Sequence, residues 1–285
     1  MNIQWYPGHM TKTRRELEKC LPLIDICVEI VDARIPKSSR NPDIDELIKN
    51  KRRIIVLNRC DLAAPKVNML WHKHFKEAGI NTIETDCKSG YGIDSFLPAI
   101  KAVFSDRLEI LKEKGQAGRT IKIMVFGIPN VGKSTFINKI AGGNLAKAEN
   151  RPGVTRGQQW IRLKGMIGSF GIDLMDTPGM LWPKIVGPQT GLNLAFTGAV
   201  RDEILDIEEL AYRLIMYINE LDSNLIKGRY NVPVEPEDTD ILEKIGKSRN
   251  LVVNGGRVDT LRTANMVVDE FRAGKMGRIT LERPK

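Results

Sequence analysis

The sequence predicts an α/β fold with a doubly wound sheet, followed by a smaller domain made of helices alone. Short apolar runs rich in β-branched residues recur in the first part of the chain, at 26–31, 54–57, 121–126 and 172–175. Such runs are typical of parallel strands that are buried on both faces. Between them the sequence favours helices at 10–20, 42–50, 65–78, 93–104 (or on to 114) and 133–141. Strands that alternate with helices indicate βαβ units and therefore a doubly wound sheet.

Beyond residue 185 the pattern becomes that of helices alone. Apolar residues recur at helical spacing over 207–221 and 261–271, which predicts two helices. A third helix is expected near 236–247, because Pro236 suits a first helical turn. No β-rich run intervenes. We therefore expect an α/β domain over 1–185 and an all-helical domain over 186–285.

The composition narrows the class of protein. The 285 residues carry 44 Lys and Arg against 35 Asp and Glu, a net charge of +9, and 101–175 alone hold thirteen basic and five acidic side chains. This charge suits a polyanionic partner such as nucleic acid, a nucleotide or a membrane surface, although an ordinary excess of surface lysine is the alternative. No run reaches the ~18 apolar residues of a membrane span. The four cysteines, without a CxxC pair, indicate reduced thiols.

Residues 127–134 match the phosphate-loop pattern G-x-x-x-x-G-K-[ST], and they lie between a predicted strand and a predicted helix. Glycines let the backbone wrap closely around phosphates, and the helix N-terminus adds positive potential. We expect Lys133 to reach the β- and γ-phosphates and Ser134 to ligate Mg²⁺. The nucleotide-contacting residues predicted here are Asn130, Val131, Gly132, Lys133, Ser134 and Thr135.

Two further features suit the metal and the γ-phosphate. Asp176-Thr-Pro-Gly179 follows the strand at 172–175. An aspartate at this position holds Mg²⁺, directly or through water, and the Gly179 N–H is placed to contact the γ-phosphate. Thr155 lies between the phosphate loop and this motif, where its hydroxyl would add a second Mg²⁺ ligand; an ordinary loop residue is the alternative.

The segment Asn58-Arg-Cys-Asp61 at the end of the strand 54–57 favours guanine over adenine. The Asp61 carboxylate would accept from both N–H groups on the N1 and N2 edge of guanine. Adenine lacks that paired donor face and would leave the carboxylate unpaired, a penalty that gives strong discrimination. Asn58 would brace the loop.

Taken together, these motifs resemble those of the translation-factor-like GTPases, but in a shuffled order. The usual order begins at the phosphate loop and ends with an NKxD motif and a SAK-type loop. Here the guanine motif and the loop 86–90 (D-C-K-S-G) precede the phosphate loop. This order is similar to that of the circularly permuted GTPases. The segments 5–10 (W-Y-P-G-H-M), 31–36 (V-D-A-R-I-P) and 176–183 fit the same family, so the likeness covers the whole chain.

The resemblance implies a fold and a function. The fold would be a P-loop GTPase domain with a circularly permuted motif order, plus the helical domain, which would contact RNA or the ribosome. The function would be that of a cytoplasmic bacterial factor that binds the precursor large ribosomal subunit, through rRNA and ribosomal proteins, and hydrolyses GTP to GDP during late assembly. The particle would stimulate the hydrolysis, Mg²⁺ would be the cofactor, and no membrane would be involved.

The resemblance also implies roles for single residues. Arg59 stands where the family has Lys and would pack over the base; Cys87 and Lys88 belong to the loop whose backbone reaches guanine O6. Asn130 would ligate K⁺, as in potassium-activated GTPases, with a loop-capping role as the alternative. Met180 occupies the position where many small GTPases place the Gln that orients water. The family likeness assigns that work to His9, in the segment 1–20, beside Lys133 and Thr155 as catalytic residues.

Two other classes of function remain open from the sequence. One is a P-loop ATP-dependent enzyme such as a kinase, for which no acceptor-substrate motif is present. The other is an RNA-binding scaffold with an inert nucleotide site, against which the intact Lys133, Ser134 and Asp176 argue. Comparing GDP with ADP affinity separates the first from a GTPase, and any GTP turnover above background excludes the second.

Overall fold

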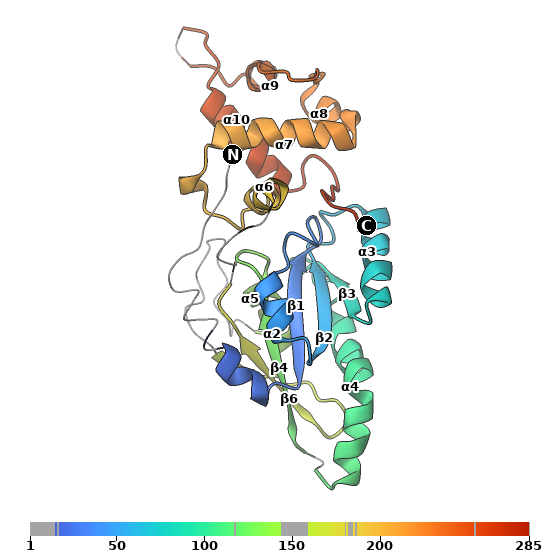
Figure 1. The fold of residues 1–285 in the computed structure, drawn as a ribbon. Helices are drawn as coiled ribbons and strands as arrows, with labels where there is room; N and C mark the ends of the chain where they lie inside the picture. Colours follow the sequence, from blue (N-terminus) through green and yellow to red (C-terminus); the bar gives the residue numbers. More distant parts are fainter. Residues whose placement is uncertain are drawn as a thin grey trace. The chain divides into compact units, whose positions relative to one another are not determined.

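The chain forms two compact units, which are described separately (Figure 1). The computed structural model describes residues 15, 17–116, 118–143, 159–179, 181, 185, 187–253 and 255–284. The described residues up to 181, together with 282–284, form the sheet unit. Residues 185–281, as far as they are described, form the helical unit.

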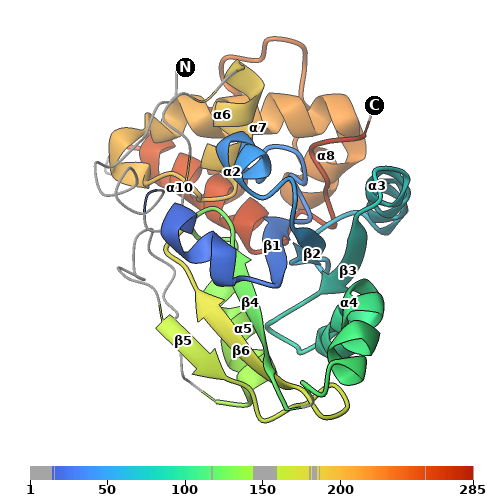
Figure 2. The same ribbon diagram turned by 60° about the horizontal axis from the view of Figure 1, so that its bottom comes forward.

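A single sheet organises the first unit. In the described part of the chain it has six strands in the order β3-β2-β1-β4-β6-β5, parallel except for β5, which runs antiparallel to β6. The strands are β1 (Ile26–Asp32), β2 (Arg52–Asn58), β3 (Asn81–Thr85), β4 (Thr120–Phe126), β5 (Gln159–Arg162) and β6 (Gly171–Asp176). Figure 2 shows β5 beside β6 at the edge of the sheet. The four predicted strands are confirmed, whereas β3 and β5 are additional.

Helices cover both faces of the sheet, so the doubly wound prediction is confirmed. The sheet unit contains α2 (Pro42–Leu47), α3 (Pro65–Glu77), α4 (Phe96–Glu113) and α5 (Lys133–Ala141), and residues 17–20 are also helical. Val67, Trp71 and Phe75 of α3 pack on Val31, Ile55 and Leu57 of one sheet face. On the other face Arg52 donates to the Val103 carbonyl of α4 at 2.9 Å. There Phe96 of α4 meets Phe136 of α5 edge-on, with ring centroids 5.4 Å apart, and both rings are fully buried.

Charged side chains lie buried between the apolar clusters on the α2–α3 face. Glu29, in the middle of β1, is fully buried and pairs with Arg53 of β2 and with Arg40. Arg53 also pairs with Asp45 of α2 at 2.5 Å. Breaking a buried pair by removing one partner is strongly destabilising, by about 3–5 kcal/mol, because the other charge stays uncompensated. This cluster therefore locks α2 and the two strands into one arrangement.

The sheet topology places the nucleotide motifs together at the carboxyl ends of the parallel strands. Strands β1 and β2 end side by side, since Asp32 pairs in register with Asn58. Strand β4 lies on the other side of β1 and ends at Phe126, directly before the phosphate loop. The chain order reverses between β1 and β4, and ligands of open α/β sheets bind at the carboxyl ends of strands at such a point.

The helical unit contains no named strand among its described residues, as the sequence predicts. Its helices are α6 (Pro188–Phe196), α7 (Ile207–Leu221), α8 (Ser223–Tyr230), α9 (Ile241–Ser248) and α10 (Thr260–Arg272). The apolar stripe of α7 is buried, and its N-cap Asp206 accepts from the Glu209 N–H at 3.1 Å. None of the helices in the described ranges is long and apolar enough to cross a lipid bilayer.

One helix start differs from the prediction. We expected a helix near 236–247 with Pro236 in its first turn, but α9 begins only at Ile241. Glu237, which directly follows Pro236, has a left-handed φ of 54°, and this backbone conformation interrupts a right-handed helix. The Asp238 carboxylate instead pairs with Lys244 of α9 at 2.7 Å and fixes the turn ahead of the helix.

Near its C-terminal end the chain returns to the sheet unit at Glu282. The Glu282 carboxylate accepts from the N–H groups of Lys37 (2.7 Å) and Ser38 (3.0 Å) and from the Ser38 hydroxyl. Its carbonyl accepts from the Trp71 indole of α3 at 3.2 Å. Hydrogen bonds to an ionised group stabilise by about 1.5–3 kcal/mol each, so Glu282 restrains the loop that follows β1.

We expect Glu282→Ala to expose this loop to solvent exchange. Hydrogen exchange at the Lys37 and Ser38 amides should accelerate by about 10-fold or more, because each loses a charged acceptor. The Ser39 amide, which donates to the Ile35 carbonyl at 2.9 Å, should keep its protection. The exposed Arg283 provides the matched control, since Arg283→Ala should leave all three amides unchanged. Unaltered exchange at Lys37 and Ser38 would contradict the prediction.

Candidate nucleotide-binding site

The phosphate loop lies between β4 and α5, the context that the motif requires. Gly127 has a φ of 155°, and a Cβ there would lie 2.4 Å from the Ile30 carbonyl oxygen of β1. Gly132 has a φ of 97° and caps α5, and a Cβ there would lie 2.4 Å from Asn58 Nδ2. Both positions therefore exclude any side chain. As a result the loop packs directly on β1 and on the end of β2.

Lys133, the first residue of α5, points back across the phosphate loop. Its Nζ donates to the Ile128 carbonyl at 2.9 Å, and the residue is buried. Burial lowers the pKa of Lys133 to about 8, and the nearby Asp176 carboxylate opposes that shift. A buried ammonium with one carbonyl partner is a ready donor for phosphate oxygens, since charge–charge attraction is strong where water is excluded.

Asp176 and Ser134 form the part of the site that suits a metal ion. Asp176 ends β6 and is buried, and its Oδ1 has no hydrogen-bond partner among the described residues. Burial raises the pKa of Asp176 to about 6, whereas Lys133, the Thr177 N–H and the Ser134 side chain act in the opposite direction. An unpaired buried carboxylate oxygen beside a hydroxyl fits Mg²⁺, a hard cation that prefers oxygen ligands. Mg²⁺ bound there would neutralise charge on the phosphates.

Gly179 lies against the phosphate loop. A Cβ at Gly179 would be 2.8 Å from Pro129 Cα and 3.1 Å from Lys133 Nζ, so only glycine fits. The Thr177 hydroxyl donates to the Val125 carbonyl of β4 at 2.9 Å and anchors the start of this segment. The loop after β6 and the phosphate loop are thus in direct contact.

Asn58 joins three segments through one side-chain amide. Its Nδ2 donates to the Val131 carbonyl of the phosphate loop at 2.7 Å. Its Oδ1 accepts from the Thr85 hydroxyl at 3.1 Å and from the Cys87 thiol at 3.0 Å. Burial raises the pKa of Cys87 to about 12, so the thiol stays a neutral donor. The amide therefore holds the loops after β2, β3 and β4 in a fixed arrangement.

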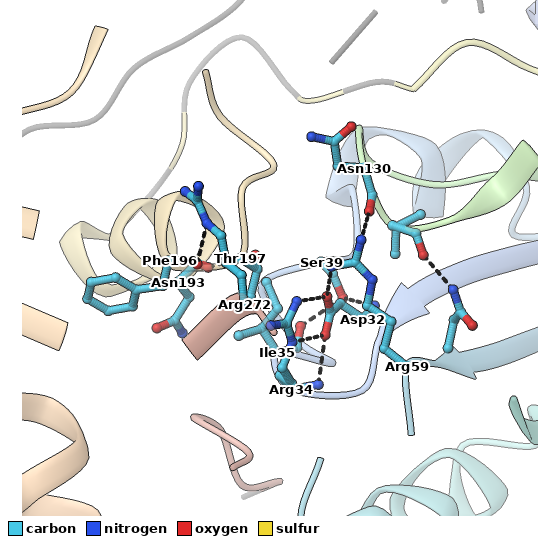
Figure 3. A network of polar contacts seen from close by, with 12 residues as sticks. Asp32, Arg34, Ile35, Ser39, Arg59, Asn130, Asn193, Phe196, Thr197 and Arg272 are labelled. Carbon is cyan, nitrogen blue, oxygen red and sulfur yellow. Dashed lines mark hydrogen bonds and ion pairs between the residues drawn. The ribbon is translucent and has the colours of Figure 1, made fainter. Parts of the chain in front are cut away.

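Arg59, directly after β2, also reaches the phosphate loop (Figure 3). Its Nη2 donates to the Asn130 carbonyl at 2.6 Å, and its Nη1 lies 3.4 Å from Asp32 Oδ2. Both Arg59 and Asn130 have left-handed backbones, with φ of 60° and 59°. Burial lowers the pKa of Arg59, and Asp32 opposes that shift. Non-glycine residues in this region cost about 1–3 kcal/mol each and persist only where surrounding contacts hold them.

The carboxylates near the predicted guanine edge play different parts. Asp61 is exposed, and partial burial together with the Asp86 charge raises its pKa. Asp86 accepts from the Lys88 and Ser89 N–H groups at 2.8 and 3.1 Å. It thereby forms the tight turn after β3, as aspartate often does. The Lys88 side chain is exposed.

The structure brings most of the predicted site residues together at the carboxyl ends of the parallel strands. The exceptions are His9 and Thr155, which lie outside the described residues together with Met180. Thr135 lies on α5, half-buried. Sequence reasoning assigned no role to Asp32 and Arg34, although their segment V-D-A-R-I-P was noted. Their position at the end of the strand next to β2 was the signal that could have found them.

Comparisons with known proteins agree with this geometry. A family model described as "50S ribosome-binding GTPase" matches residues 122–254. The chain is 42% identical over its full length to ribosome biogenesis GTPase A of Bacillus cereus, covering 95% of that protein. It is 28% identical to the Thermotoga maritima protein of that name, over 99% of this chain and 95% of that one. It is similar to a crystal structure of GNP-bound YlqF from T. maritima, with a TM-score of 0.69 and 26% identity, covering 96% of this chain and 99% of that one.

Proposed function

The chain belongs to the ribosome biogenesis GTPase A family and is a GTP-hydrolysing enzyme, and on that premise we propose that it matures the large ribosomal subunit. In this proposal it binds the precursor large subunit, through rRNA and ribosomal proteins, and hydrolyses GTP late in assembly. The particle stimulates the hydrolysis. The protein acts in the cytoplasm.

One observation carries the proposal: segments that are far apart and permuted in the sequence meet through Asn58 at the phosphate loop. That geometry supports a guanine-nucleotide switch with its motifs in the permuted order. The full-length similarity to proteins named for ribosome biogenesis supports the ribosomal partner. The net charge of +9 suits a partner rich in phosphate, and we assign rRNA contact to the helical unit.

The proposed chemistry follows from the positions of the side chains. Lys133 takes up charge on the β- and γ-phosphates, and the Gly179 N–H contacts the γ-phosphate. Ser134, Asp176 and Thr155 hold Mg²⁺. Asp61 accepts from the guanine edge, while Asn58, Arg59, Cys87 and Lys88 shape the base pocket.

The residue after Gly179, Met180, explains why the proposed hydrolysis needs stimulation by the particle. Met180 has no group that hydrogen-bonds to the attacking water, so the free protein turns over slowly. His9 orients that water when the ribosomal particle places it, since imidazole accepts a hydrogen bond near neutral pH. By analogy with activated small GTPases, such placement accelerates hydrolysis by up to about 10⁵-fold, or about 7 kcal/mol.

The proposal is tested by GTP turnover with and without immature large subunits, for the wild type and His9→Ala. We expect immature large subunits, but not small subunits, to stimulate the wild type strongly. The His9→Ala variant should lose the stimulation and keep its GDP affinity. Turnover that large-subunit particles leave unchanged would contradict the ribosomal role, and full stimulation of His9→Ala would remove His9 from the mechanism.

The same assay in K⁺ and in Na⁺ buffers tests Asn130 as a K⁺ ligand. A monovalent cation beside the phosphates would neutralise charge that builds on the bridging oxygens. We expect faster turnover in K⁺. Equal turnover in the two buffers would leave Asn130 with its loop role alone.

A further inference from the structure

Asp32 and Arg34 lie where three nucleotide-site segments meet, yet neither is part of the proposed site. Asp32 ends β1, between the strand that leads to the guanine motif and the strand that leads to the phosphate loop. Both side chains are almost fully buried, with exposed fractions of 2% for Asp32 and 1% for Arg34. Buried charges of this kind are rare unless they are paired.

The two side chains form a two-pronged ion pair that fixes the direction of the carboxylate. Arg34 Nε donates to Asp32 Oδ1 at 2.9 Å, and Nη2 donates to Oδ2 at 2.7 Å. The Arg34 N–H adds a bond to Oδ1 at 3.0 Å. On the backbone, the Asp32 N–H donates to the Ser39 hydroxyl at 3.1 Å. The carboxylate therefore has one orientation, set by its own turn.

That orientation presents Oδ2 to Arg59. Figure 3 shows Asp32 between Arg34 and Arg59, and Arg59 reaching on to Asn130. The Ala33 N–H also donates to the Asn58 carbonyl at 2.9 Å, so backbone and side chain both tie the turn to the end of β2. A continuous chain of contacts thus runs from Arg34 through Asp32 and Arg59 to the phosphate loop.

We propose that Asp32, oriented by Arg34, is a positioning residue that sets nucleotide affinity by holding Arg59 between the guanine motif and the phosphate loop. Two guanidinium groups approach each other here, and the Asp32 carboxylate lies between them. Without the Asp32 charge, Arg34 would repel Arg59, and Arg59 would lose a contact that helps to hold its left-handed backbone in place. The Asn130 carbonyl would then lose the hydrogen bond from Arg59 that ties the phosphate loop to the guanine motif.

A merely structural ion pair would behave differently, and the chain offers a matched control. Glu29 lies on the same strand, is equally buried and also pairs with arginine, but its partners Arg40 and Arg53 lie away from the nucleotide segments. Glu29→Gln and Asp32→Asn therefore remove the same kind of charge from the same strand. Both should lower the melting temperature of the nucleotide-free protein, whereas only Asp32→Asn should change nucleotide release.

The test is a double-mutant cycle on the release of a fluorescent GDP analogue from the full chain. We expect Asp32→Asn and Arg59→Ala each to speed release by about 10-fold. In the Arg59→Ala background, Asp32→Asn should change release by less than about 2-fold, because its effect passes through Arg59. Independent effects would instead multiply to about 100-fold. That multiplication, or release from Asp32→Asn at the wild-type rate, would overturn the proposal.

A second variant covers the case in which Asp32→Asn does not fold. Arg34→Lys keeps the charge but cannot make the two-pronged bond, so the carboxylate loses its fixed direction. It should speed release by about 3-fold, and not at all in the Arg59→Ala background. An equal effect in both backgrounds would overturn the proposal as well.

The inference rests on the proposed guanine site and not on the ribosomal role. If Asp61→Asn leaves GDP affinity unchanged, the assignment of the guanine site fails. The assay with ribosomal particles tests the ribosomal role alone.

Discussion

Replacing Asp61 with asparagine should lower the affinity for GDP by about 10³-fold or more and create affinity for the xanthine nucleotide. The carboxylate offers two acceptors to the N1–H and 2-amino groups of guanine. Asparagine offers one acceptor and one donor, so its amide N–H would face the guanine amino group and leave donors unpaired. Sites built to hydrogen-bond a ligand group reject the mismatched analogue by about 10⁴–10⁵-fold in favourable cases. Xanthine carries an oxygen at that position and restores the pairing.

Equilibrium titration with GDP, ADP and xanthosine diphosphate measures this exchange of preference. Asp86→Asn is the matched control, because Asp86 is a neighbouring carboxylate whose oxygens accept from its own turn. An asparagine keeps that turn, and the loss of the Asp86 charge lowers the pKa of Asp61 toward its ordinary value. GDP affinity of the control should therefore stay within about 3-fold. Comparable GDP binding by Asp61→Asn and the wild type would place the base elsewhere.

The parts of the fold that sequence predicts well are those with a local cause. Most residues of the four strands with β-branched apolar runs are buried. The glycines of the phosphate loop are needed because a Cβ at Gly127 or Gly132 would lie only 2.4 Å from another atom. The α7 stripe likewise reports one buried face of a helix. In each case the residue types and their spacing carry the structural reason themselves.

The elements that escaped prediction lack such a local cause. Strand β3 reads N-T-I-E-T, and only Ile83 and Thr85 are buried, so it lacks an apolar run. Helix α6 buries residues 191–196 without a break and therefore shows no amphipathic period. Both are held by packing on other elements: β3 pairs with β2, and α6 packs on α7 and α10.

Contacts between segments that are distant in the sequence also explain features that the sequence did not predict. The contact of Glu282 with Ser38 joins residues 244 positions apart, and no pattern in either segment announces it. The V-D-A-R-I-P segment was visible, but its meaning depends on Arg59, which reaches it only after β1 and β2 pair in register. Residue types predicted which groups could bind a nucleotide; the fold determines which other groups hold them in place.

Replacing Lys133 with methionine should reduce GTP turnover by about 10²–10³-fold, the usual effect of removing one preorganised charged donor from a reacting group. Methionine keeps most of the side-chain volume and removes the desolvation cost of the ammonium, but it also leaves the buried Asp176 carboxylate without the charge that opposes its burial. The melting temperature of the free variant, measured beside its turnover, therefore separates lost chemistry from lost folding. The exposed Lys139 on the same helix is the control, and Lys139→Met should turn over GTP normally.

The pH dependence of GDP affinity identifies the same group by its charge. With the pKa of Lys133 lowered to about 8, the free protein loses the ammonium above that pH and must take up a proton to bind phosphate. Affinity should then fall by up to about tenfold per pH unit above pH 8. With the pKa of Asp176 raised to about 6, binding in Mg²⁺ buffer must release a proton below that pH, so affinity also falls on the acid side. Lys133→Met should abolish the alkaline limb and move the acid limb to higher pH, because Lys133 no longer lowers the pKa of Asp176. Asp176→Asn or removal of Mg²⁺ should abolish the contribution of Asp176 to the acid limb. An alkaline limb that persists in Lys133→Met would assign that titration to another group.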